Sequence, residues 1–101
     1  MVTVAQYLVE RRLMEVSKRL RRAREELAVA DEQLSALVEL ADDARLRSLV
    51  SETPLAARQS QEAQRHAEAM SGARDSLAAL VKRLEGELDE LLDKLVPGAA
   101  S

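Results

Sequence analysis

The sequence predicts an all-α protein in which two long helices fold back on each other as an antiparallel coiled-coil hairpin. Apolar residues recur at alternating intervals of four and three from Val9 to Ala44, and a second pattern of the same kind follows Pro54. Aromatic residues make up 1% of the 101-residue chain and charged residues 33%. This composition is typical of long helices and does not favour a globular core.

The first helix is expected to span residues 4 to about 50. Thr3 and Gln6 have the spacing of a capping box, in which each side chain accepts a hydrogen bond from the other residue's backbone amide. The predicted seam consists of Leu13, Leu20, Leu27 and Leu34 at positions a, and of Val9, Val16, Ala23, Ala30 and Leu37 at positions d. Ser48 interrupts the apolar stripe, so we expect a change of register or a loose last turn there.

A turn is expected at residues 51–54. Pro54 disfavours helical geometry at the preceding residue and suits the first position of a helix, so Thr53 should cap a second helix from residue 54 to about 96. The second seam consists of Ala63, Met70, Leu77, Leu84 and Leu91 at d, and of Ala67, Arg74, Val81, Leu88 and Leu95 at a. Residues 97–101 should form a loose tail, and residues 1–101 a single domain.

The charge distribution favours the antiparallel arrangement. Between Glu10 and Glu26 there are seven basic and four acidic residues, whereas Lys82 to Lys94 contains five acidic and three basic residues. A short turn brings these stretches together, with residues whose numbers add up to about 105 at similar heights. Each exposed ion pair contributes roughly a few tenths of a kcal/mol, but the set disfavours a parallel or shifted pairing.

A two-helix seam leaves some apolar residues uncovered, and these are the candidate protein interface: Met14, Val29, Val38, Leu40 and Leu80. A homodimer that forms an antiparallel four-helix bundle would cover them, because packing on two sides broadens the apolar face. Arg74 is a further interface candidate, since a cation inside a seam can select register or partner. Alternatively, its side chain reaches the seam's edge. We therefore expect a non-enzymatic protein–protein interaction or scaffold module, with itself or another protein as partner.

Nucleic-acid binding is an alternative carried by the basic residues of the first helix: Arg11, Arg12, Lys18, Arg19, Arg21, Arg22 and Arg24. Such a face could neutralise phosphates in a salt-dependent, sequence-independent manner. However, Leu20 and Ala23 within this run belong to the seam, and no aromatic residue is available to stack on bases. In the antiparallel arrangement, acidic residues of the second helix also lie opposite these basic residues. These observations favour a solvated face that is neutralised within the chain.

A third hypothesis concerns the acidic end of the hairpin, where the candidate residues are Asp42, Asp43 and Glu52. An acidic tip on an antiparallel coiled coil resembles the transcription-cleavage factors, whose hairpin enters the RNA polymerase secondary channel and holds magnesium through carboxylates. The resemblance implies a regulator of a larger enzyme such as RNA polymerase. Those factors carry a globular domain that this sequence does not show, and the paired aspartates precede the turn by roughly ten residues. A solvated helix end is therefore favoured.

The sequence contains no constellation typical of an enzyme. Cysteine is absent, which excludes disulfides and thiolate chemistry, and His66 is the only histidine. A lone histidine completes neither a catalytic triad nor a metal site, although Glu62 could pair with it. We expect no catalytic residue, cofactor or metal. No apolar run reaches the roughly 18 residues that span a bilayer, and no signal peptide is evident, so a cytoplasmic protein without membrane contact is expected.

Three stretches, Arg22–Leu34, Ala41–Ala56 and Glu62–Ala67, resemble small helical coiled-coil proteins of high-GC actinobacteria. They cover about a third of the chain and are rich in alanine and arginine. The resemblance implies a bacterial, cytoplasmic protein and brings no activity with it.

Overall fold

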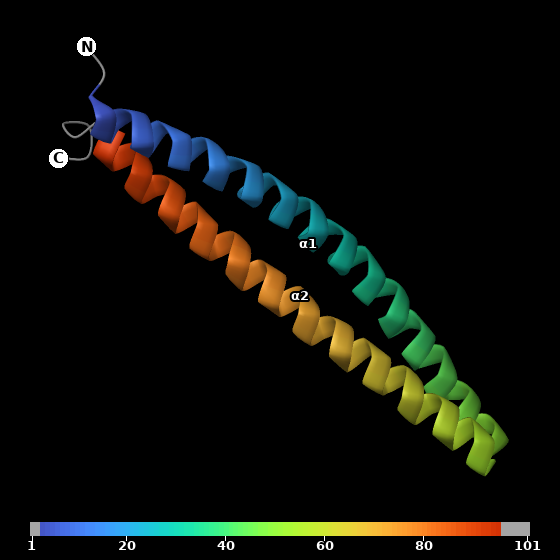
Figure 1. Cartoon of the computed structure of the whole chain (residues 1–101). Helices are drawn as coiled ribbons and strands as arrows, with labels where there is room; N and C mark the ends of the chain where they lie inside the picture. The colour runs from blue at the N-terminus through green and yellow to red at the C-terminus, as the bar shows by residue number, and fades with distance from the viewer. Residues whose placement is uncertain (1–2, 96–101) are drawn as a thin grey trace. The chain divides into compact units, whose positions relative to one another are not determined.

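The chain is all-α and consists of two long antiparallel helices, α1 (Val4–Ser51) and α2 (Pro54–Leu95) (Figure 1). The computed structural model describes residues 3–95. The predicted helical hairpin is thereby confirmed. Residue 96 and the tail expected at 97–101 lie outside the described residues.

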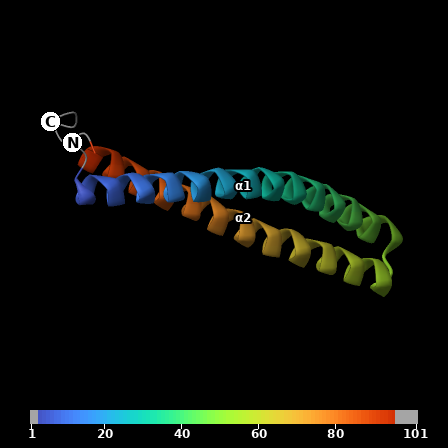
Figure 2. The same cartoon turned by 45° about the horizontal axis from the view of Figure 1, so that its top comes forward.

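Contacts group the chain into two units, each built from one segment of α1 and one of α2. The terminal unit comprises Met1–Glu26 and Leu77–Ser101, and the turn unit comprises Leu27–Ser76. In the turn unit, the end of α1 passes through a short loop into α2 (Figure 2). The expectation of a single domain stays a prediction.

The heptad stripe of α1 forms the core. Every residue predicted at position a or d between Val9 and Ala44 is buried or half-buried, whereas almost all other side chains of α1 are exposed. In the terminal unit, Val16 of α1 and Leu84 of α2 are the largest fully buried side chains. In the turn unit, the buried apolar residues are alanines: Ala30, Ala41, Ala44 and Ala56. The predicted seam is confirmed.

The change of register or loose last turn expected near Ser48 is wrong, because Glu52 N lies 3.0 Å from Ser48 O and closes the last turn of the helix. Helix α1 continues to Ser51, Ser48 remains half-buried in the stripe, and Leu46 and Leu49 are exposed. A serine can occupy the seam here because partial exposure allows its hydroxyl group to stay hydrated. The small residues Ala41 and Ala44 keep the heptad spacing up to this point.

Both predicted N-caps are present. Thr3 Oγ1 accepts a hydrogen bond from Gln6 N at 3.1 Å, and Gln6 Oε1 accepts one from Thr3 N at 3.0 Å. Thr53 Oγ1 accepts a hydrogen bond from Ala56 N at 3.1 Å. Each cap satisfies backbone amides that have no partner within the first turn of a helix.

Glu52 ends α1 in the left-handed conformation, with φ at 51°. Its amide nitrogen lies 3.0 Å from the carbonyl oxygen of Ser48, which completes a C-terminal αL motif. A side chain at such a position is strained by about 1–2 kcal/mol, and glycine is the usual residue there. The turn residues did not reveal this conformation, because Glu52 carries no sequence signal for it.

Replacing Glu52 with glycine should therefore stabilise the protein. We expect Glu52→Gly to raise the free energy of unfolding by about 0.5–1 kcal/mol, after allowance for the greater freedom of glycine in the unfolded chain. Urea unfolding followed by circular dichroism, at a fixed protein concentration, measures this change. Gln64→Gly, at an exposed site within α2, is the control and should lower stability by about 1 kcal/mol. A destabilised Glu52→Gly variant would contradict the argument.

Candidate functional site

Large apolar side chains on the surface form the first candidate site. Among the described residues, twelve are exposed: Val4, Tyr7, Leu8, Met14, Val29, Val38, Leu40, Leu46, Leu49, Val50, Leu55 and Leu92. Four of the predicted interface residues belong to this set, with exposed fractions from 43% at Val38 to 62% at Met14. The fifth, Leu80, is half-buried.

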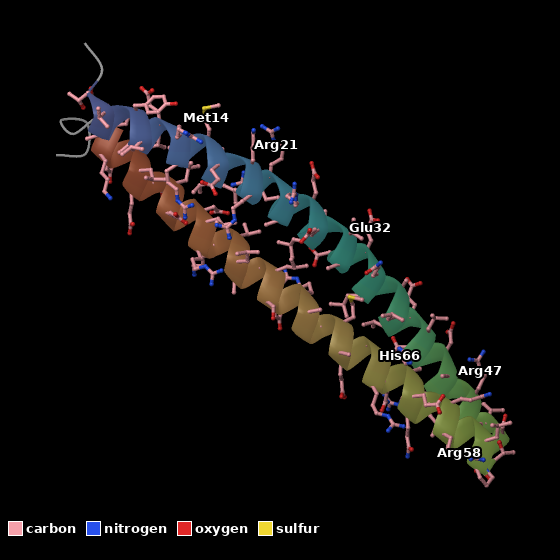
Figure 3. The ribbon with its side chains drawn as sticks, viewed as in Figure 1. Met14, Arg21, Glu32, Arg47, Arg58 and His66 are labelled. Atoms are coloured by element: carbon pink, nitrogen blue, oxygen red, sulfur yellow. The ribbon has the colours of Figure 1, made fainter. Side chains whose placement is uncertain are left out.

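The structure does not gather the predicted interface residues into one patch. Met14 lies in the terminal unit, where its side chain points away from α2 (Figure 3). Val29, Val38 and Leu40 lie in the turn unit. A helix turns by about 100° per residue, so Val38 and Leu40 lie on opposite flanks of the seam.

Sequence reasoning missed an apolar cluster beside the loop: Leu46, Leu49, Val50 and Leu55. Leu49 and Val50 follow Leu46 by three and four residues along α1, which places all three on one face of the helix. That spacing lies off the seam, so the heptad pattern assigns these residues no place in the core. It was a signal for an exposed apolar face.

A shallow groove lies between α1 and α2 within the turn unit. Its lining residues are Leu40, Ala44, Arg47, Gln59, Glu62, Ala63 and His66. We call it the turn groove. Alanines occupy the seam at its floor, and the longer side chains flank them. Figure 3 labels Arg47 on α1 and His66 on α2. No ion pair joins His66 to Glu62 in the described part of the chain.

Two hollows lie in the terminal unit. One is lined by Arg19, Arg22, Ala23, Glu26, Leu80 and Leu84. The other is lined by Arg11, Met14, Glu15 and Lys18, all of them from α1. The first brings the predicted interface residue Leu80 next to basic residues of α1, and the second does the same for Met14.

Two of the seven basic residues of the nucleic-acid hypothesis pair with α2. Arg12 Nη2 lies 2.6 Å from Glu87 Oε1, and Arg24 Nη2 lies 3.5 Å from Glu85 Oε1. The hydrogen bond to Glu87, together with the charge of this carboxylate, raises the pKa of Arg12 above its usual value. Both ion pairs join residues of the two stretches that the antiparallel charge pattern sets against each other.

The other five cations are Arg11, Lys18, Arg19, Arg21 and Arg22, and none of them forms an ion pair within residues 3–95. The expected neutralisation of this face within the chain thus holds only at Arg12 and Arg24. The reason is geometric, because Arg21 and most of its basic neighbours occupy outer heptad positions that face away from the seam. Figure 3 shows Arg21 pointing away from α2.

Arg74 reaches the edge of the seam, as in the second of the two interpretations of its sequence position. Its Nε lies 2.7 Å from Asp31 Oδ1 on α1, and its Nη1 lies 3.3 Å from Asp75 Oδ1. The hydrogen bond to Asp31 is the main cause that raises the pKa of Arg74 above its usual value. Its guanidinium group is therefore engaged within the turn unit.

The three acidic residues of the tip hypothesis do not converge. Asp42 and Asp43 are exposed on α1, whereas Glu52 lies in the loop, about 13 Å further along the direction of the helix at roughly 1.5 Å per residue. In residues 3–95, no three or more His, Cys, Asp or Glu side chains are grouped so that they could hold a metal ion. Within the same residues, no helix is long and apolar enough to cross a membrane.

The Arg74–Asp31 pair leads to a stability prediction. Replacing Arg74 with leucine should raise the midpoint of thermal unfolding, because an apolar side chain at a seam position packs without a charge to hydrate. Asp31→Asn alone should lower the midpoint, since Arg74 then loses its closest partner. In the Arg74→Leu background, Asp31→Asn should have little effect. A lower midpoint for Arg74→Leu would show that the ion pair contributes more than the apolar packing.

Comparisons with protein-family models, with curated proteins and with solved structures found no match to this chain.

Proposed function

We propose that this protein is a non-enzymatic protein–protein interaction or scaffold module that acts through the exposed apolar residues of its helical hairpin. The observation that carries the proposal is the contrast between core and surface. The single apolar stripe of each helix is used within the chain, yet twelve large apolar side chains among residues 3–95 stay exposed. Single exposed apolar residues are ordinary, whereas a cluster such as Leu46, Leu49 and Val50 is typical of interaction surfaces.

The small core supports a second element of the proposal, which is that the hairpin forms a homodimer. Ten hydrophobic residues are buried in the described part of the chain, and five of them are alanines. Such a core stabilises a small fold weakly, and oligomerisation is a common remedy. Two hairpins that pair as an antiparallel four-helix bundle would bury apolar side chains on the flanks of the seam. A bacterial, cytoplasmic setting follows from the resemblance to actinobacterial proteins.

Nucleic-acid binding remains a second candidate, supported by five of its seven candidate basic residues, which have no ion pair in residues 3–95. We rank it below protein binding for two reasons. Glu15, Glu25 and Glu26 lie on the same helix and reduce its net charge. The described residues contain one aromatic side chain, Tyr7, so bases have little to stack on. The hypothesis of a regulator that acts through an acidic tip lacks support, because the three carboxylates do not converge.

Sedimentation velocity over micromolar concentrations tests the homodimer. We expect a concentration-dependent dimer, because two copies can cover apolar residues that one copy leaves exposed. A folded, stable monomer throughout this range would contradict the dimer. Affinity capture from the native host tests the wider interaction role. Captured proteins should be lost when Leu46, Leu49 and Val50 are replaced together by serine, whereas an unchanged set would argue against this cluster.

Titration with duplex DNA at two salt concentrations separates protein binding from nucleic-acid binding. We expect no binding at low salt. Binding that weakens steeply as salt is added would favour the nucleic-acid hypothesis, because phosphate contacts release counterions. In that case Lys18→Glu with Arg21→Glu should abolish it, while Asp42→Asn with Asp43→Asn, the matched pair from the acidic end, should leave it unchanged or stronger. The asparagine pair combined with Glu52→Gln also tests the tip hypothesis, which predicts loss of partner capture.

A further inference from the structure

We infer that the turn groove is the surface on which a second copy of this chain docks, with the two copies related by a two-fold axis. The inference rests on the proposed function and specifies which surface and which partner that function uses. The residues that line the turn groove all belong to the turn unit, Leu27–Ser76.

The shape of the groove suits a packed helix. Ala44 and Ala63 at its floor carry only methyl groups, so a second helix can approach closely. Leu40 at its edge is 56% exposed, so more than half of it is left uncovered by the described residues. A leucine of this kind can insert between side chains of a facing helix, as a knob in a hole. In a two-fold dimer, Leu40 of each copy enters the groove of the other.

The charges of the groove are complementary to those of the same groove on a second copy. The lining contains one cation, Arg47, and one carboxylate, Glu62, and neither forms an ion pair among residues 3–95. An acidic or a basic partner would satisfy one of these groups and repel the other. A second copy satisfies both, because a two-fold interface presents the same surface from each side.

The antiparallel course of α1 and α2 makes this pairing geometrically consistent. Consider a two-fold axis that runs parallel to the helices, between the two facing grooves. It places α1 of one copy opposite α2 of the other, and corresponding residues of the two copies keep the same position along the helix direction. Arg47 then lies near the partner's Glu62, and Glu62 near the partner's Arg47. Each helix segment is antiparallel to both of its neighbours, which is the arrangement of a four-helix bundle. The proposed interface thus needs no change of the fold within either copy.

Charge reversal tests the inference sharply. Arg47→Glu and Glu62→Arg should each weaken self-association at least tenfold, because like charges then face each other twice in the dimer. A mixture of the two variants should form heterodimers, since both cross-contacts become attractive again. The double variant, Arg47→Glu with Glu62→Arg, should recover self-association. Sedimentation velocity measures the single and double variants, and capture of untagged Arg47→Glu by tagged Glu62→Arg measures the mixture.

Two leucines of α1 provide a matched control. Leu40→Lys should weaken self-association, while Leu46→Lys should not, although Leu46 is 61% exposed and lies in the same helix. Circular dichroism of every variant verifies that the helices remain folded. If Leu40→Lys and both charge-reversal variants dimerise as strongly as the wild-type chain, the inference is overturned and the proposed interaction role is left standing. A mixture without heterodimers, or a wild-type chain that stays monomeric, would also overturn it.

Discussion

A single narrow seam between two helices is the constraint on which the rest of this structure depends. The residues at positions a and d of α1 from Val9 to Ala44 are buried or half-buried, and nearly all its other side chains face solvent. Half of the buried apolar residues in the described part of the chain are alanines, which let the helices approach closely but bury little surface each. The hairpin therefore has a thin core. The αL cap at Glu52 and the two threonine caps complete the ends of the helices around it.

The same constraint explains the surface. A seam that faces one direction leaves the outer heptad positions of each helix without a partner in the chain. Five of the seven cations between Arg11 and Arg24 consequently have no ion pair in residues 3–95, and apolar residues such as Met14 and Leu46 are exposed. Arg74 occupies a seam position, but its charged group lies at the edge of the seam, where it pairs with Asp31. Surface residues, rather than the core, therefore distinguish the functional hypotheses.

The alanines have two consequences in the turn unit. Their small side chains allow α1 and α2 to approach each other, and they leave the shallow turn groove between longer flanking side chains. A groove with one cation, one carboxylate and a leucine that is 56% exposed is suited to a copy of itself. The proposed dimer links the composition of the seam to assembly, because small residues that weaken the core of one copy make room for the helix of another.

The sequence by itself determined the local structure: the helix ends, the caps at Thr3 and Thr53, and the seam residues. These follow from nearest-neighbour chemistry and from the 3.6-residue period of the helix. The tertiary structure decided which charges meet and which apolar residues lie together. Arg12 and Arg24 find carboxylates while Arg21 does not, because side-chain direction around the helix decides contact. The left-handed Glu52 and the groove beside Ala44 likewise depend on how two segments meet in space, which heptad spacing alone does not specify.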